Sequence, residues 1–208
     1  MESLGGGSAA GFMDAPNLAL ASTSEAYPCD GVDEQYRAGC FKYLPAFAQA
    51  RFRSENLTDR TEMVRRETVA CERFRGIDRM RCLYGIGLNV SGRIFQNNPE
   101  EIPGLCDRFS SSDERKACTI GLVTNWVQFN RGSDALSLCA GITEAERRHV
   151  CYVNAFEHMT HKSGAAYIAA LCEGTFIRAT CMPEYEMYRS NPSAAVAPQK
   201  TLLGPGLW

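Results

Sequence analysis

Residues 106–118 have the sequence CDRFSSSDERKAC, and this stretch decides the fold. It holds two cysteines twelve residues apart, with an arginine three residues before the second, and its plan returns at residues 139–151 as CAGITEAERRHVC. Three further segments share this plan, with cysteine spacings of eleven or nine residues. The five predicted disulfide pairs are Cys29 with Cys40, Cys71 with Cys82, Cys106 with Cys118, Cys139 with Cys151, and Cys172 with Cys181. The arginines are Arg37, Arg79, Arg115, Arg148 and Arg178.

The first cysteines of successive pairs lie 42, 35, 33 and 33 residues apart, which approaches the period of two-helix repeats. Because all five arginines stand at one offset from the second cysteine, the chain contains an internal repeat. The repeat domain, residues 27–189, is divided here into unit 1 to unit 5, with approximate bounds 27–55, 56–97, 98–131, 132–161 and 162–189.

Each unit is predicted to be a short helix ending near the first cysteine, a tight turn, and a longer helix carrying the second. In unit 3, Ser111 or Ser112 precedes acidic residues, as at a helix start. The turn brings the two cysteines within the roughly 4.4–6.8 Å Cα separation that a disulfide needs. Pro45 is expected to kink or end the second helix of unit 1. The predicted fold is all-α, a right-handed stack of four to five disulfide-clamped helical hairpins.

In period and plan this organisation resembles Sel1-like and tetratricopeptide helical-hairpin repeats, some of which are disulfide-stapled in secreted bacterial proteins. The resemblance implies an α-solenoid-like stack whose surface binds other molecules. The Arg-x-x-Cys feature is not part of those families' signatures, so it belongs to this chain.

The ten cysteines are even in number and dispersed, and the sequence contains no CxxC. Structural zinc and thioredoxin-like chemistry both favour closely spaced cysteines, so five disulfides and an extracytoplasmic, periplasmic or secreted location are expected. The alternative is ten reduced, buried cysteines. Residues 1–23 contain no lysine or arginine and only short apolar runs, so they do not resemble a secretory leader.

The formal net charge is −2, with the two signs interspersed, so no nucleic-acid partner is expected. No apolar run approaches the roughly 18 residues of a membrane span. The sequence has no P-loop, GxGxxG, GxSxG, HExxH or CxxCH motif. We therefore expect no cofactor and no catalytic activity.

Both ends of the chain differ from the repeat. Residues 1–26 are rich in Gly, Ser and Ala and are predicted to be a flexible arm, and residues 190–208 are predicted to be an extended, Pro-rich arm. Leu202, Leu203 and Trp208 in the second arm, together with Trp126, are the predicted partner contacts. Two alternatives stay open: the C-terminal arm folds onto its own repeat, and Trp126 belongs to the core.

The repeat arginines have two interpretations. Stacked in register, their guanidinium groups would form a ladder that binds carboxylates or phosphates. Alternatively, each arginine covers its local disulfide and bonds either the last carbonyls of the preceding helix or the acid after the first cysteine.

His158 and His161, with Met159 beside them, are separated by three residues on a predicted helix and are the candidate ligands for copper or zinc. The function expected from these features is a non-catalytic extracytoplasmic scaffold or accessory subunit. It would bind another protein, such as a component of a membrane-associated complex, through the repeat surface and the terminal arms. The alternatives are a periplasmic metal-binding protein using the two histidines, and a thiol-redox protein if cysteines are free.

Overall fold

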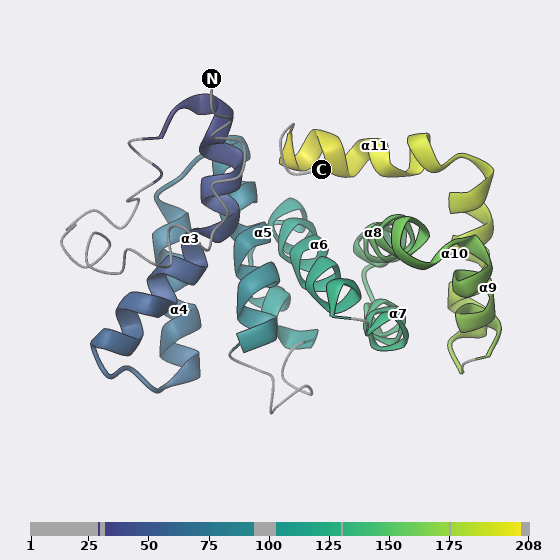
Figure 1. Ribbon diagram of the computed structural model, residues 1–208, viewed down its shortest axis with the longest axis horizontal. Coiled ribbons are helices and arrows are strands. Elements are labelled where there is room, and N and C mark those ends of the chain that lie inside the picture. The colour runs from purple at the N-terminus through teal and green to yellow at the C-terminus, as the bar shows by residue number, and fades with distance from the viewer. Residues whose placement is uncertain (1–28, 30–31, 94–102, 130, 175, 205–208) are drawn as a thin grey trace, which may run out of the picture.

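The computed structural model describes residues 29, 32–93, 103–129, 131–174 and 176–204 (Figure 1). Within these residues the protein has nine α-helices, one 3-10 helix and no strand. In chain order the elements are α3 (Glu34–Ser54), α4 (Arg60–Glu72), α5 (Gly76–Arg93), η3 (Pro103–Arg108), α6 (Ser112–Gln128), α7 (Gly132–Gly141), α8 (Ala145–Ser163), α9 (Ala165–Glu173), α10 (Arg178–Ser190) and α11 (Pro192–Leu203). The N-terminal arm, residues 1–26, and Trp208 lie outside the described residues.

All five predicted disulfides are present, each within one unit and with Cα atoms 5.3–5.6 Å apart. The bonds join Cys29 to Cys40, Cys71 to Cys82, Cys106 to Cys118, Cys139 to Cys151, and Cys172 to Cys181. No cysteine is left free, so the alternative of reduced, buried cysteines does not describe this fold.

Each disulfide closes one hairpin. In units 2 to 5 the bond joins a shorter element to the longer helix that follows it: α4 to α5, η3 to α6, α7 to α8, and α9 to α10. The second cysteine of each of these pairs, Cys82, Cys118, Cys151 or Cys181, lies in the longer helix, as predicted. In unit 1, Cys29 is joined to Cys40 of α3.

The longer helices form a row in chain order, in which α3 packs on α5, α5 on α6, α6 on α8, and α8 on α10 (Figure 1). The shorter elements α4, η3, α7 and α9 each pack on the longer helix of their own unit. An all-α stack of disulfide-clamped hairpins is thus confirmed, while its likeness to the Sel1-like and tetratricopeptide plan stays a prediction. None of the helices in the described part of the chain combines the length and apolar character needed to cross a bilayer.

Glycines let neighbouring helices of the row approach closely. A Cβ atom on Gly87 of α5 would collide with the Cys118 carbonyl of α6, and one on Gly121 of α6 would collide with the Tyr84 carbonyl of α5. Gly85, on another face of α5, would bring a Cβ within 2.6 Å of the Lys42 carbonyl of α3. The backbones of three consecutive units therefore touch where larger residues would hold them apart.

The second helix of unit 1 does not end at Pro45, because α3 continues through this residue to Ser54. A proline inside a helix removes the hydrogen bond to the carbonyl four residues earlier, which here is that of Phe41. That carbonyl lies 2.8 Å from the place a Cβ atom of Gly85 would take. The carbonyl released by Pro45 therefore faces the glycine of the neighbouring helix.

The prediction of an extended C-terminal arm is wrong for residues 192–203, which form α11. Asn191 caps this helix by accepting a hydrogen bond from the Ala194 N–H, and Pro192 occupies the first helical turn, where a proline is tolerated. One face of the helix, with Val196, Gln199 and Leu203, is buried. The proline content alone favours an extended chain, whereas burial of this face favours the helix.

Helix α11 turns back from α10 and lies across α8, α6 and α5 (Figure 1). Two buried side-chain hydrogen bonds fix it there. The Arg81 Nε donates to the Leu203 carbonyl at 3.0 Å, and the Gln199 Nε2 donates to the Val150 carbonyl at 3.2 Å. The arm is therefore an integral part of the fold and ties unit 2 to unit 4.

The close approach of α5 and α6 gives a direct test. We expect Gly121→Ala to lower the free energy of unfolding by about 1–3 kcal/mol, because the added methyl group must push the two backbones apart. Gly39→Ala is the matched control, since nothing lies within 4 Å of its Cβ position in α3. It should stabilise the protein by about 0.5–1 kcal/mol through helix propensity. Urea denaturation measures both, and equal effects of the two variants would contradict this packing.

Candidate functional site

The repeat arginines bond the turn of their own hairpin. The Arg115 Nη1 donates to the carbonyls of Phe109 and Ser110 at 3.0 and 2.9 Å. Arg148 donates to the Ile142 carbonyl at 3.1 Å, and Arg79 donates to that of Glu72 at 3.3 Å. These contacts agree with the structural interpretation of the arginines, because each of the three guanidinium groups is used to hold the chain that follows the first cysteine.

The same arginines also reach the next unit. Arg79 binds Glu114 with an N–O distance of 2.7 Å, and Arg115 binds Glu144 at 3.1 Å. Arg37 lies 3.8 Å from Asp78. The three acids stand in the first turn or at the N-cap of α6, α8 and α5, where the helix dipole also favours a negative charge. Arg178 in unit 5 is exposed.

These ion pairs lower the pKa of two of the acids, Glu114 and Glu144. Burial acts to raise the pKa of Glu114, but the Ser111 backbone N–H and the charge of Arg79 outweigh it and hold the pKa below its ordinary value. Hydrogen bonds from Ser112 and Arg115 lower the pKa of Glu144. Both carboxylates are therefore charged at neutral pH, and the unit-to-unit contacts are charge-assisted.

Three asparagines, of which Asn125 and Asn154 are buried, form a second set of contacts between units, which sequence reasoning missed. The Nδ2 atoms of Asn89, Asn125 and Asn154 donate to main-chain carbonyls of the preceding longer helix, at 2.9, 2.7 and 3.1 Å. Each asparagine stands inside a helix among apolar residues. This position in the sequence was the signal that could have predicted a polar contact between helices. Since a buried amide without a partner is costly, these bonds select one register between neighbouring helices.

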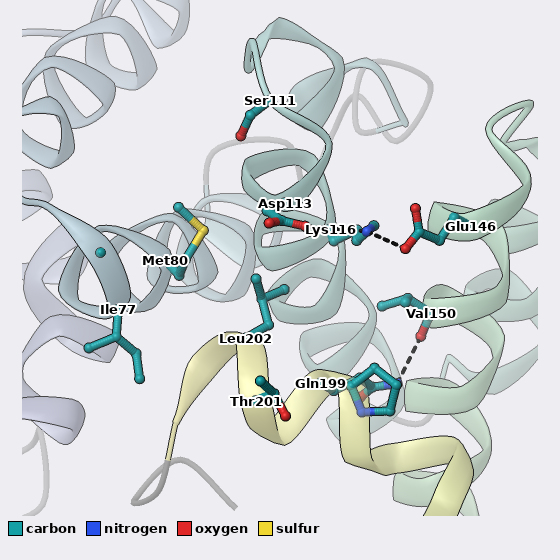
Figure 2. Close-up of a pocket in the computed structure, with 12 residues that line it drawn as sticks. Ile77, Met80, Ser111, Asp113, Lys116, Glu146, Val150, Gln199, Thr201 and Leu202 are labelled. Carbon is teal, nitrogen blue, oxygen red and sulfur yellow. Dashed lines mark hydrogen bonds and ion pairs between the residues drawn. The ribbon is translucent and has the colours of Figure 1, made fainter.

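A groove of about 660 Å³ opens where α11 crosses the row (Figure 2). Its walls are the N-terminal turns of α5, α6 and α8, and α11 closes the fourth side. In Figure 2, Ile77 and Met80 come from α5 on one side, Lys116 and Glu146 face each other on the other, and Leu202 lies between them. The groove therefore has an apolar side and a charged side, and three successive units contribute to it.

Two polar groups of the groove are almost fully buried. The Lys116 ammonium is bound by Glu146 at 2.6 Å and by Asp113 at 3.3 Å. Burial acts to lower the pKa of Lys116, but the two carboxylates outweigh it and raise the pKa above its ordinary value. Gln199 is 1 % exposed; its Nε2 donates to the Val150 carbonyl, whereas its Oε1 has no hydrogen-bond partner among the described residues. The groove thus offers an apolar surface beside charged groups.

The predicted partner contacts lie mostly inside the protein. Trp126 is 6 % exposed and packs in the core, with the Arg131 guanidinium 4.9 Å from its ring centre. Leu203 is fully buried, because α11 folds onto the row. Leu202 is partly buried and is the only one of the three that lines the groove. Burial therefore excludes Trp126 and Leu203 as contact residues of the folded chain.

The two histidines have different neighbours. The His158 Nε2 lies 3.2 Å from the Thr124 Oγ1, whereas the His161 Nε2 lies 3.3 Å from the Glu157 Oε1. Met159, proposed beside them as a ligand, is buried in the core. In the part of the chain that the structure describes, no three His, Cys, Asp or Glu residues are grouped as a metal site would require.

The fold defines a structural class, which is that of all-α proteins built from helix pairs that are each clamped by one disulfide. Comparison with known protein families, with curated protein sequences and with solved structures finds no match to this chain.

The contact between units 2 and 3 can be measured by a double-mutant cycle. Arg79→Gln and Glu114→Gln should each cost about 1.5–3 kcal/mol, and the coupling between them should exceed about 1 kcal/mol, because the pair is partly buried and charge-assisted. The matched control is the pair Arg65–Glu62 on the surface of α4, whose coupling should be clearly weaker than that of Arg79 with Glu114, because solvent screens it. Equal coupling energies in the two cycles would refute a structural role for the arginines between units.

Proposed function

We propose that the protein is a non-catalytic extracytoplasmic accessory subunit or scaffold that binds another protein, and that the groove beside α11 is its main contact surface. The observation that carries this proposal is the composition of the groove. Units 2, 3 and 4 and α11 all contribute to it, and it joins the apolar Ile77, Met80 and Leu202 to the charges of Asp113, Lys116 and Glu146. An apolar centre with a polar rim is the usual composition of a protein interface.

Rigidity supports the same proposal. Five disulfides hold the hairpins, and ion pairs, asparagines and close glycine contacts hold the units against one another. A surface fixed in this way loses little conformational entropy when it binds, so more of its contact energy appears as affinity. The extracytoplasmic location rests on the disulfides, which persist in oxidising compartments.

Two exposed aromatic side chains are candidates for further contacts. Phe176 is 90 % exposed and Phe129 is 68 % exposed. Aromatic residues are enriched at interfaces because they bury a large area with few rotatable bonds. They replace Trp126 and Leu203, whose side chains are buried.

A thiol-redox function needs a free cysteine as its nucleophile, whereas all ten cysteines are paired in disulfides. The metal-binding alternative has the two histidines but no grouped third ligand among the described residues. Neither alternative has an observation in its favour that matches the groove.

Site-specific photo-crosslinking tests the proposal. p-Benzoylphenylalanine in place of Ile77 should give one covalent adduct of defined mass when the protein is expressed in its own host, because Ile77 is partly exposed at the groove. Once the partner is identified, Ile77→Asp should weaken binding about tenfold or more, as expected for a contact residue.

The same reagent at Arg65 is the matched control, since this residue is exposed, does not line the groove and lies in another unit than Phe129 and Phe176. An adduct from the groove position alone supports the proposal. Adducts of equal yield from both positions, or none from the groove, would exclude the groove as the contact surface.

A further inference from the structure

The chain contains two triplets of the kind that accepts N-linked oligosaccharides. The acceptor sequence is Asn-x-Ser/Thr with x other than proline, and it occurs at Asn56-Leu57-Thr58 and at Asn89-Val90-Ser91. The first triplet lies in the turn between α3 and α4, and the second lies inside α5. The two triplets are equivalent as sequences, but their surroundings in the fold differ.

The side-chain amide of Asn89 is already used by the fold. Its Nδ2 donates to the Lys42 carbonyl at 2.9 Å and to the Gly85 carbonyl at 2.8 Å, so both hydrogens of the amide group are engaged. A sugar on this nitrogen would replace one of these hydrogens and would have to fit between α3 and α5. These helices lie so close that even a Cβ atom on Gly85 would come within 2.6 Å of the Lys42 carbonyl. A glycan at Asn89 is therefore incompatible with the fold.

The side chains of Asn56 and Thr58 are exposed and free. Neither of them has a hydrogen-bond partner among the residues that the structure describes. The hydroxyl groups of Thr68 and Thr119, by contrast, donate to the carbonyl four residues earlier in their helices, at 2.8 Å. An oligosaccharide transferase needs the asparagine amide as its nucleophile and the hydroxyl two residues later as a binding contact. The turn leaves both of these groups accessible.

The conformation of the turn explains the asparagine but not the threonine. Asn56 has a φ of 56° and is the only non-glycine residue among those described with a positive φ, a conformation that asparagine tolerates better than most residues. The start of α4 is capped by Asp59, which accepts a hydrogen bond from the Glu62 N–H at 3.2 Å. Thr58 takes no part in this cap, so the fold gives no other role to its hydroxyl group.

A glycan at this turn leaves the groove open. Figure 1 shows the turn between α3 and α4 at the lower left edge of the molecule, whereas α11, which closes the groove, runs along the top. An oligosaccharide is bulky and hydrophilic, so it covers the surface from which it projects. One molecule can therefore carry the glycan and bind a partner in the groove.

We propose that Asn56 is an N-glycosylation site, with a lipid-linked oligosaccharide as the donor. The Asn56 Nδ2 attacks C1 of the first sugar, and the bond from C1 to the pyrophosphate oxygen breaks. The lipid pyrophosphate leaves with the electron pair of that bond, and the amide proton passes to a base of the transferase. The site rests on the extracytoplasmic location in the proposed function and does not depend on the groove.

Mass spectrometry of the full chain, purified from its own host, tests the proposal. Treatment with peptide-N-glycosidase F should remove the mass of one oligosaccharide and convert Asn56, but not Asn89, to aspartate. Asn56→Gln and Thr58→Ala should each abolish the modification, whereas Thr58→Ser should retain it because the hydroxyl is kept. An unmodified Asn56, or a glycan at Asn89, would overturn the proposal. Thr58→Ala keeps the test valid if Asn56→Gln, which places another side chain at a positive φ, is unstable.

Ser91→Ala is the matched control, because it removes the second triplet and leaves the Asn89 amide in place. Its glycan should equal that of the unaltered protein. Alkylation of the same native samples separates this site from the location on which it rests. An unglycosylated protein with all ten cysteines paired overturns the site alone, whereas an unglycosylated protein with free thiols overturns the extracytoplasmic location as well.

Discussion

The rest of the structure depends on the closure of each hairpin by a disulfide next to an arginine. The cystine joins the end of one element to the helix that follows, and one turn earlier the arginine binds the carbonyls of the connecting turn in units 2, 3 and 4. By the loop-entropy model a closure of this length contributes on the order of 3 kcal/mol. Elements as short as η3, six residues, or α9, nine residues, would be marginal without it.

Closed hairpins become a single body through contacts that repeat from unit to unit. Three kinds of contact act between neighbouring longer helices of the row. Arginines bind acids at the start of the next longer helix, asparagines donate to carbonyls of the previous one, and glycines let the two backbones touch. Helix α11 adds a connection that spans several units. The groove exists because the starts of α5, α6 and α8 are held at fixed separations and α11 is laid across them. Its shape is therefore a consequence of the repeat.

The features that the sequence predicts correctly depend on residues that lie close together in the chain. The disulfide pairs and the helix start at Ser111 follow from residues close together in the chain, and they are found. The predictions that failed concern residues whose environment is set by packing between helices. Pro45 and Pro198 are helix breakers by residue type, but α3 and α11 continue through them. The burial of Trp126 could not be judged from its type alone. The groove combines residues from several helices, so no pattern along the sequence predicts it.

Mass spectrometry of a non-reduced tryptic digest tests the central claim most directly. At least one arginine or lysine lies between every two successive cysteines, so trypsin places the ten cysteines on ten separate peptides. The structure predicts five linked pairs, each joining the two cysteines of one unit, and no peptide alkylated under native conditions. A link between cysteines of different units, or a free thiol in the native protein, would contradict the account.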